Sequence, residues 1–253
     1  MTIEETNKKP RRNVTANLPK ATIVRKQNVT HDLWLIWLKP DVSFGFKPGQ
    51  YCTIGVDEIE RPYSIASSPD EDLIELFIEL VPKPDGVLTP LLYDLNEGDQ
   101  VTIRPRAKGI FTLDQNYTNH LMVSTVTGVA PYVSMLRDLE HNNNLSDAKI
   151  YVIEGASFSE EFVYDKELES FDSRYPNVTF VPTVSRPEDP KNKEWTGTTG
   201  RANEIVERYL QEFGLLREDT LVYACGHPGM IEDVKERMDR LDFPFKEERF
   251  WKD

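Results

Sequence analysis

Two strings in the first half of the chain combine residue types that bind phosphates and planar rings. Residues 61–64 read RPYS, which offers a guanidinium for a phosphate, an aromatic face for a ring and a hydroxyl for a ring nitrogen. Four residues alone are more often part of an ordinary strand. Residues 86–90 read GVLTP and open a short helix, whose free N–H groups suit a pyrophosphate. Thr89 as N-cap and Pro90 at the first helical position would also suit a helix that binds nothing.

A third string, TVTGVAP at residues 125–131, lies between an apolar segment and a helical pattern. It lacks the G-x-G-x-x-G spacing of dinucleotide-binding turns. Gly128 nevertheless allows a tight turn, Pro131 suits the first helical turn, and the backbone N–H groups between them would face a phosphate. The string therefore predicts a phosphate-binding turn at the carboxyl end of a strand.

Two further strings follow strand-like segments in the second half. CGHPGM at 225–230 has glycines that permit close approach of a ligand, and Cys225 could form a small wall beside a reactive ring or be a buried structural cysteine. VSR at 184–186 and GR at 200–201 supply a hydroxyl and two guanidiniums, which could select a 2′-phosphate. Lone arginines are also common on solvated surfaces.

These strings are positioned by two different patterns of secondary structure. Up to about residue 117, short β-type segments alternate with Gly/Pro/Asp turns, which is typical of an antiparallel sandwich or barrel. From residue 118 strands alternate with helices, which predicts a parallel sheet covered on both faces. We expect a tail over 1–19, one domain over 20–117 and a second over 118–253.

Composition excludes several classes of protein. The chain has 253 residues, of which 39% are hydrophobic and 29% charged, so a buried core is expected. No apolar run is long enough to span a bilayer, and the polar N-terminus is not a secretory signal. The net charge of −13 disfavours a sequence-independent grip on nucleic acid. Two distant cysteines and four scattered histidines give no metal or iron–sulfur spacing and fit a reducing cytoplasm.

Taken in order, the strings resemble the ferredoxin–NADP(+) reductase family, in particular the bacterial ferredoxin/flavodoxin reductases. The match runs over roughly residues 20–253 and includes FKPGQY at 46–51 and PDGVLTPLL at 84–92. The resemblance implies an N-terminal antiparallel Greek-key β-barrel that binds FAD, followed by a parallel-sheet, Rossmann-like α/β domain that binds NADP(H). It implies hydride transfer between NADP(H) and FAD, then single-electron transfer to or from ferredoxin or flavodoxin.

The resemblance also assigns roles to individual residues. Around the flavin, Arg61 would bind the pyrophosphate, Tyr63 would stack on the isoalloxazine, and Ser64 would approach its N5. Ser64, Thr127 and Cys225 would form the catalytic group, with Gly128 and Gly226 beside the nicotinamide. The other residues expected to contact the cofactors are Pro62, Phe77, Ile78, Leu80, Val81, Val87, Leu88 and Thr89 for FAD, and Ser185, Arg186 and Arg201 for the 2′-phosphate.

The C-terminus departs from a single pattern. In one register Phe250 covers the flavin and Trp251 the adenine, and an aromatic pair with two stacking faces favours this one. In the other register Arg249 faces the flavin and Phe250 the adenine, which suits the longer tail. A second departure is Val126 before Thr127, where the family often has glycine; this would tighten the approach of the nicotinamide.

The carrier that exchanges electrons with the flavin is expected to be acidic, although this chain is acidic too. Arg104, Arg106 and Lys108 alternate, so in an extended strand they would share one face, with Lys47 and Lys83 nearby. A solvated basic edge explains the same pattern. We expect a monomer. A reductase component of an oxygenase, or a nucleotide-binding module without catalysis, are the alternative functions.

Overall fold

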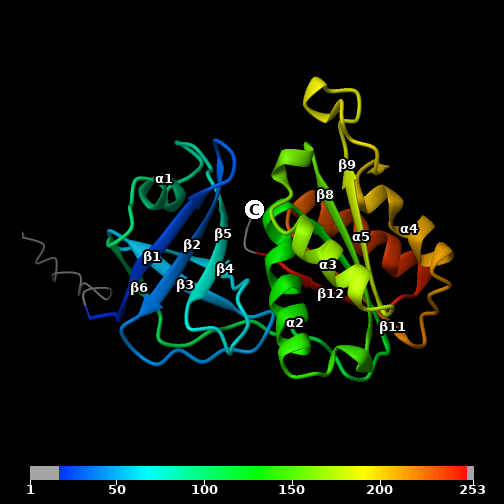
Figure 1. Ribbon diagram of the computed structural model, residues 1–253, viewed down its shortest axis with the longest axis horizontal. Helices are drawn as coiled ribbons and strands as arrows, with labels where there is room; N and C mark the ends of the chain where they lie inside the picture. Colours follow the sequence, from blue (N-terminus) through cyan, green and yellow to red (C-terminus); the bar gives the residue numbers. More distant parts are fainter. Residues whose placement is uncertain (1–16, 250–253) are drawn as a thin grey trace, which may run out of the picture.

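The computed structural model describes residues 17–249, which form a β-barrel followed by a parallel sheet with helices on both faces (Figure 1). The barrel carries one short helix, α1 (Leu88–Tyr93). Its six strands are β1 (Lys20–Asn28), β2 (Leu33–Pro40), β3 (Tyr51–Val56), β4 (Ile59–Ser64), β5 (Ile74–Glu79) and β6 (Gln100–Ile103).

The first sheet has the order β4-β3-β6-β1-β2-β5, and all its pairs are antiparallel. Insertion of β6 between β1 and β3 is the Greek-key connection. An antiparallel bridge between Ile65, which follows β4, and Leu76 of β5 joins the two outer strands and closes the barrel. The predicted Greek-key barrel is confirmed.

The second sheet has the order β10-β9-β8-β7-β11-β12 and is entirely parallel. This confirms the predicted α/β architecture. Its strands are β7 (Asn119–Thr125), β8 (Lys149–Ala156), β9 (Val178–Val184), β10 (Thr198–Thr199), β11 (Thr220–Cys225) and β12 (Phe245–Glu248). Its α-helices are α2 (Ala130–His141), α3 (Asp165–Arg174), α4 (Ala202–Glu212) and α5 (Pro228–Leu241).

The apolar run of β2 shows how the two halves pack. Its residues alternate between two cores: Trp34, Ile36 and Leu38 fill the barrel, while Leu33 and Leu35 join the core beneath α2 and α3. A strand buried on both faces needs a continuous apolar run rather than alternation. The barrel wall is therefore also part of the core of the α/β half.

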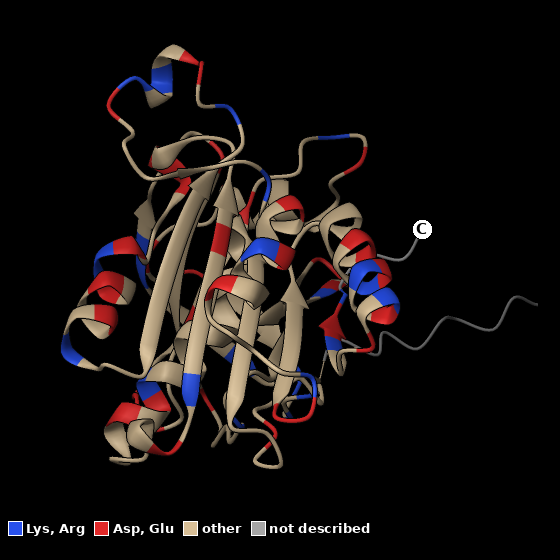
Figure 2. Ribbon diagram, turned by 90° about the vertical axis from the view of Figure 1, so that its right-hand side faces the viewer, with Lys and Arg blue, Asp and Glu red and all other residues tan. Residues whose placement is uncertain are grey.

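Charged residues lie mostly on the helices and loops that cover the parallel sheet, and its strands carry few of them (Figure 2). Among the residues described, no helix is long and apolar enough to cross a membrane. The same part of the chain contains no cluster of His, Cys, Asp and Glu that could hold a metal ion.

Candidate active site

Three polar side chains from different segments meet where the barrel joins the parallel sheet. Ser64 ends β4, Cys225 ends β11, and Glu248 ends β12. The parallel pairing of β11 with β12 places Cys225 opposite Glu248. The Ser64 hydroxyl lies close to the thiol of Cys225, and this contact acts to lower the thiol pKa against the larger effect of burial. One half of the molecule thus contributes the hydroxyl, and the other contributes the thiol and the carboxyl.

Burial controls the charge of these groups. Cys225 is 2% exposed, and burial, then the Glu248 carboxylate, raises the pKa of its thiol well above the usual range. Burial also raises the pKa of Glu248, 8% exposed, to about 8. At neutral pH the site therefore holds a neutral thiol and a carboxyl that is mostly protonated.

Two of these side chains have unused hydrogen-bonding capacity. The buried Oγ of Ser64 and Oε2 of Glu248 have no hydrogen-bond partner of good geometry in the part of the chain that the structure describes. Buried polar atoms of this kind are uncommon in folded proteins, because an unmade hydrogen bond costs stability. Both atoms thus retain capacity for a further hydrogen bond.

Glycines bring the loops after β7 and β11 into contact. A Cβ on Gly128 would lie 2.2 Å from the carbonyl oxygen of Cys225, so only glycine fits this crossing. Gly226 has φ +128°, and a Cβ there would lie 2.3 Å from Thr125 Oγ1. Thr125 Oγ1 accepts a hydrogen bond from the His227 backbone at 2.8 Å. The third and fourth strings of the sequence therefore form one surface at the carboxyl ends of β7 and β11, where open α/β sheets bind ligands.

The predicted phosphate-selecting residues lie at the carboxyl end of β9 and the start of α4. Ser185 donates its backbone N–H to the carbonyl of Ala156, the last residue of β8, at 2.9 Å. The exposed Arg186 guanidinium lies over the Phe158 ring, 5.3 Å from its centroid. Arg201 is the exposed N-cap residue of α4, and its side chain makes no ion pair or hydrogen bond among residues 17–249. Both guanidiniums remain accessible to an anion.

On the barrel, the residues of the RPYS string occupy successive positions of β4. Arg61 is exposed and donates a hydrogen bond to the Glu60 carbonyl at 2.8 Å. Tyr63 is partly buried and packs against the barrel core, while Pro62 is half-buried between them. Strand alternation therefore separates Arg61 and Tyr63 from Ser64, which points to the other face of β4.

The expectation that Thr89 caps α1 is wrong. The helix begins at Leu88, which is buried, and the N-cap residue is the exposed Val87. The Thr89 hydroxyl instead accepts from the Val81 backbone N–H and donates to its carbonyl, both at 3.0 Å. This double contact across the loop occupies the hydroxyl that the cap would need.

The remaining predicted flavin contacts lie on β5 and just after it. Phe77 is buried at the interface and meets the Tyr164 ring edge-on at 5.9 Å, whereas Ile78 points into the barrel. Leu80 packs partly against the barrel core, and Val81 is half-buried beside Thr89. A cofactor at this strand would meet the backbone and the exposed side chains rather than Ile78.

The expected basic stripe does not form as a strand face. β6 ends at Ile103, and the chain bends at residues 105–106. Arg104 is neutralised by Glu60, through Nε to Oε1 at 2.9 Å and Nη2 to Oε2 at 2.6 Å. Arg106 and Lys108 remain exposed, without an ion pair in the described part of the chain.

Comparisons with known proteins agree with this arrangement. The family model described as an oxidoreductase FAD-binding domain matches residues 20–110, and that described as an oxidoreductase NAD-binding domain matches residues 122–236. The ferredoxin–NADP reductase of Pseudomonas aeruginosa is 30% identical over 213 residues, covering 77% of this chain and 78% of that protein. The chain belongs to the ferredoxin/flavodoxin–NADP reductase family.

Other relatives of this chain span the same two halves. The flavodoxin/ferredoxin–NADP reductase of Escherichia coli K12 is 28% identical over 226 residues, covering 84% of this chain and 86% of that one. The phenol hydroxylase P5 protein of Acinetobacter pittii is 30% identical over 220 residues, covering 85% of this chain and 60% of the P5 protein. A ferredoxin NADP+ reductase from Neisseria gonorrhoeae, crystallised with FAD and NADP, shares the fold with TM-score 0.77 and 23% identity, covering 92% and 98% of the two chains.

Glu248 is a residue of the candidate site that the sequence analysis did not predict. The signal was a carboxylate two residues before the aromatic pair Phe250 and Trp251, but the segment FKEE lacks the apolar alternation that identifies a strand. The two aromatic residues expected to cover flavin and adenine lie outside the described residues. Arg249, the alternative residue at the flavin, donates hydrogen bonds to Glu232 at 2.6 Å and to Glu247 at 2.9 Å.

Proposed function

We propose that this protein is an FAD-dependent oxidoreductase that transfers a hydride between NADP(H) and FAD and single electrons to or from ferredoxin or flavodoxin. The observation that carries the proposal is the cluster of Ser64, Cys225 and Glu248 at the contact between the two matched halves. We divide the chain accordingly into a tail (1–19), an FAD domain (20–117) and an NADP domain (118–253).

In the FAD domain, the fit rests on the exposed guanidinium of Arg61 and the unpartnered hydroxyl of Ser64. We assign Arg61 to the pyrophosphate, Tyr63 to the isoalloxazine face and Ser64 to its N5. The free N–H groups at the start of α1, from Val87 to Thr89, would complete the pyrophosphate site. Pro62 and the backbone of Phe77–Val81 would line the remainder.

In the NADP domain, the crossing at Gly128 leaves no Cβ between the loops after β7 and β11. We assign Thr127, Gly128, Cys225 and Gly226 to the nicotinamide, whose ring would lie against a neutral thiol. A neutral thiol offers no competing nucleophile to the reacting ring. Ser185, Arg186 and Arg201 would hold the 2′-phosphate and favour NADP over NAD.

When bound, FAD supplies the redox chemistry, taking a hydride from NADPH and releasing electrons one at a time. The protein supplies position and protons. The Ser64 hydroxyl would hold the reacting edge of the flavin by a hydrogen bond. Glu248, with its pKa near 8, can give up or regain a proton at Oε2 close to neutral pH, so we assign it to proton exchange with the site.

The carrier would dock beside Gly109, where a Cβ would lie 3.1 Å from Glu248 Oε1. The next residue, Ile110, is 85% exposed, and the cations Lys108 and Arg106 precede it. Lys47 joins this surface through Gln50, which accepts from the Lys47 backbone N–H and donates to the Gly109 carbonyl at 3.0 Å. Unpaired cations around an apolar residue suit an acidic carrier such as ferredoxin or flavodoxin.

The second candidate is the reductase component of an oxygenase, which the similarity to the phenol hydroxylase P5 protein favours. The match covers 60% of the P5 protein, so the remaining part of that protein is not aligned with this chain. The two candidates share the flavin chemistry and differ in the carrier. Reduction of purified ferredoxin or flavodoxin at a higher kcat/KM than an oxygenase-type ferredoxin would favour the first.

A single spectrum tests the shared chemistry. Purified protein, supplied with FAD if necessary, should show flavin absorption that bleaches when NADPH is added without air. NADPH-dependent reduction of ferricyanide should follow the same flavin content. Protein that binds no FAD, or that binds it and is not bleached, would contradict the proposal and leave a nucleotide-binding module as the better reading.

A further inference from the structure

Helix α2 holds the segment that follows Ser64. One turn into the helix, Ser134 Oγ donates to the Ser67 carbonyl at 2.7 Å. One turn later, Arg137 Nη1 donates to the Ala66 carbonyl at 3.3 Å and to Glu75 Oε2 at 2.8 Å. These contacts cross from the α/β half to the barrel.

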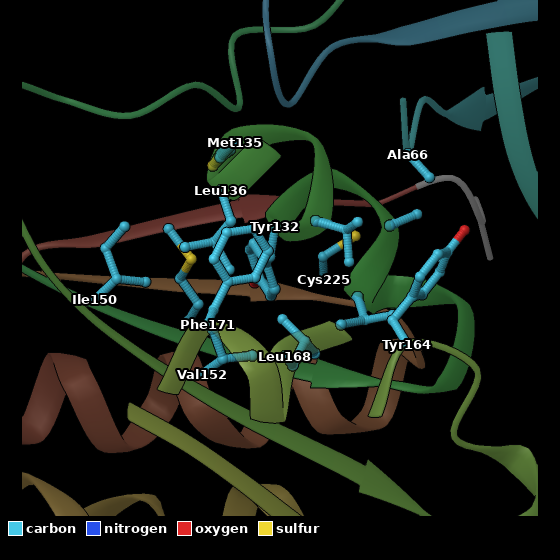
Figure 3. Packing of buried hydrophobic residues seen from close by; sticks show 14 of the residues in the cluster. Ala66, Tyr132, Met135, Leu136, Ile150, Val152, Tyr164, Leu168, Phe171 and Cys225 are labelled. Atoms are coloured by element: carbon cyan, nitrogen blue, oxygen red, sulfur yellow. The ribbon is translucent and has the colours of Figure 1, made fainter. Parts of the chain in front are cut away.

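Glu75 of β5 is the buried centre of this contact, with 4% of its surface exposed. Its Oε2 accepts from Arg137, and its Oε1 accepts from the Tyr164 hydroxyl at 2.7 Å. Figure 3 shows the Tyr164 hydroxyl directed toward the barrel segment of Ala66. Two donors from the α/β half thus satisfy one carboxylate of the barrel, which is the arrangement a buried charge requires.

Arg137 is also fixed by a contact with helix α3. Its Nε and Nη2 donate to the two carboxylate oxygens of Glu167, on α3, at 2.7 and 2.8 Å. A bidentate pair of this kind fixes the plane of the guanidinium as well as its position. The remaining nitrogen, Nη1, therefore presents a fixed donor edge to Ala66 and Glu75 rather than a mobile charge.

The two ends of this chain of contacts are the two sides of the proposed reaction centre. On one side, α2 follows directly on the loop that contains Thr127 and Gly128, and helix geometry places Arg137 about 15 Å along the same rigid rod. On the other side, Ala66 is two residues after Ser64 and donates its N–H to the Glu75 carbonyl at 2.9 Å.

Resting on the proposed function, we propose that Arg137 is a positioning residue for hydride transfer. Through Glu75 and Ala66 it sets the separation between the nicotinamide loop at Thr127–Gly128 and the flavin-facing Ser64. It touches neither cofactor. Its effect is on geometry, and displacement of reacting atoms by about 1 Å can slow a reaction about 100-fold.

The test compares Arg137→Gln and Glu75→Gln with a matched control, Arg174→Gln. Arg174 also contacts α2, through Glu140, but that ion pair lies within the α/β half and is exposed. Flavin-loaded proteins are mixed with saturating NADPH in a stopped-flow instrument, and bleaching is measured per bound flavin. Arg137→Gln and Glu75→Gln should each slow bleaching 10- to 100-fold, and the double variant should be no slower than the slower single variant. Arg174→Gln should match the wild type.

Three further readouts separate positioning from a merely structural role. NADP+ affinity should stay within about threefold, the long-wavelength absorption of stacked nicotinamide and flavin should weaken, and chemically reduced protein should still reduce ferricyanide at the wild-type rate. The rate of amide hydrogen exchange should rise at residues 65–68 in both Arg137→Gln and Glu75→Gln, with or without cofactors. Arg137→Lys keeps the charge but loses the planar fork, so it should fold and still slow bleaching.

The outcomes are distinguishable. Bleaching within twofold of wild type in Arg137→Gln and Glu75→Gln would overturn the inference and leave the proposed function standing. Slow bleaching that is fully explained by lost FAD or lost NADP+ affinity would also overturn it. A wild-type protein that does not bleach would overturn the proposed function, and with it any positioning role.

Discussion

Replacement of Glu248 by Gln should remove a pH dependence of stability. The pKa of this carboxyl is about 8 in the folded protein, and its ordinary value of 4.5 applies in the unfolded chain. The folded protein therefore binds more protons than the unfolded chain between these values, and its stability falls as pH rises through them. At about 1.36 kcal/mol per pKa unit, the full loss is about 5 kcal/mol, of which roughly 3 kcal/mol falls between pH 6 and pH 9.

Urea unfolding at fixed excess FAD, from pH 6 to pH 9, measures this loss. The wild type should lose about 3 kcal/mol more than Glu248→Gln, because the amide cannot ionise. The control is Glu169→Gln, an exposed carboxylate on α3, which should leave the wild-type slope unchanged. If wild type and Glu248→Gln lose the same free energy over this range, Glu248 is not the buried acid of the site, and its proton role fails with it.

Three other changes probe the rest of the site. Gly128→Ala should lower the free energy of unfolding by about 1–3 kcal/mol and weaken NADP+ binding, because the added Cβ would meet the Cys225 carbonyl. The control Gly45→Ala, whose Cβ would have nothing within 4 Å, should change neither quantity. Equal unfolding midpoints for Gly128→Ala and the wild type would contradict this prediction. Arg201→Ala should raise KM for NADPH about 10- to 100-fold and leave NADH kinetics unchanged. The reason is that a charge-assisted hydrogen bond contributes roughly 1.5–3 kcal/mol to binding. An equal effect on both cofactors would argue against a contact with the 2′-phosphate. Lys108→Glu should slow reduction of an acidic carrier and weaken its salt dependence while sparing ferricyanide, and unchanged carrier kinetics would remove this surface.

The architecture could be predicted from the sequence because the spacing of apolar residues indicates the strands and helices. Alternation and turn residues predict the barrel strands, and the change to strand–helix alternation near residue 118 predicts the parallel sheet. These patterns follow from burial of one face, which any sequence with this fold must satisfy.

The contacts that complete the site leave no such pattern. β12 is held by backbone hydrogen bonds to β11, which do not require apolar side chains. Glu75 and Arg137 look like charges on solvated faces until the fold places them at 2.8 Å between two cores. Thr89 failed as a cap because its hydroxyl is used across the loop by Val81. Each of these depends on residues far apart in the chain.

The cost of the site is itself an argument for its function. A fold selected only for stability would give Ser64 a hydrogen-bond partner and would replace a buried carboxyl beside a buried thiol with apolar groups. Two of the unpartnered buried atoms, Ser64 Oγ and Glu248 Oε2, lie where the two halves meet, next to loops that approach too closely for any side chain at Gly128. A ligand that accepts a hydrogen bond from Ser64 and exchanges a proton with Glu248 would supply the missing partners. A flavin ring held between the barrel and the sheet, as proposed above, would meet both requirements at once.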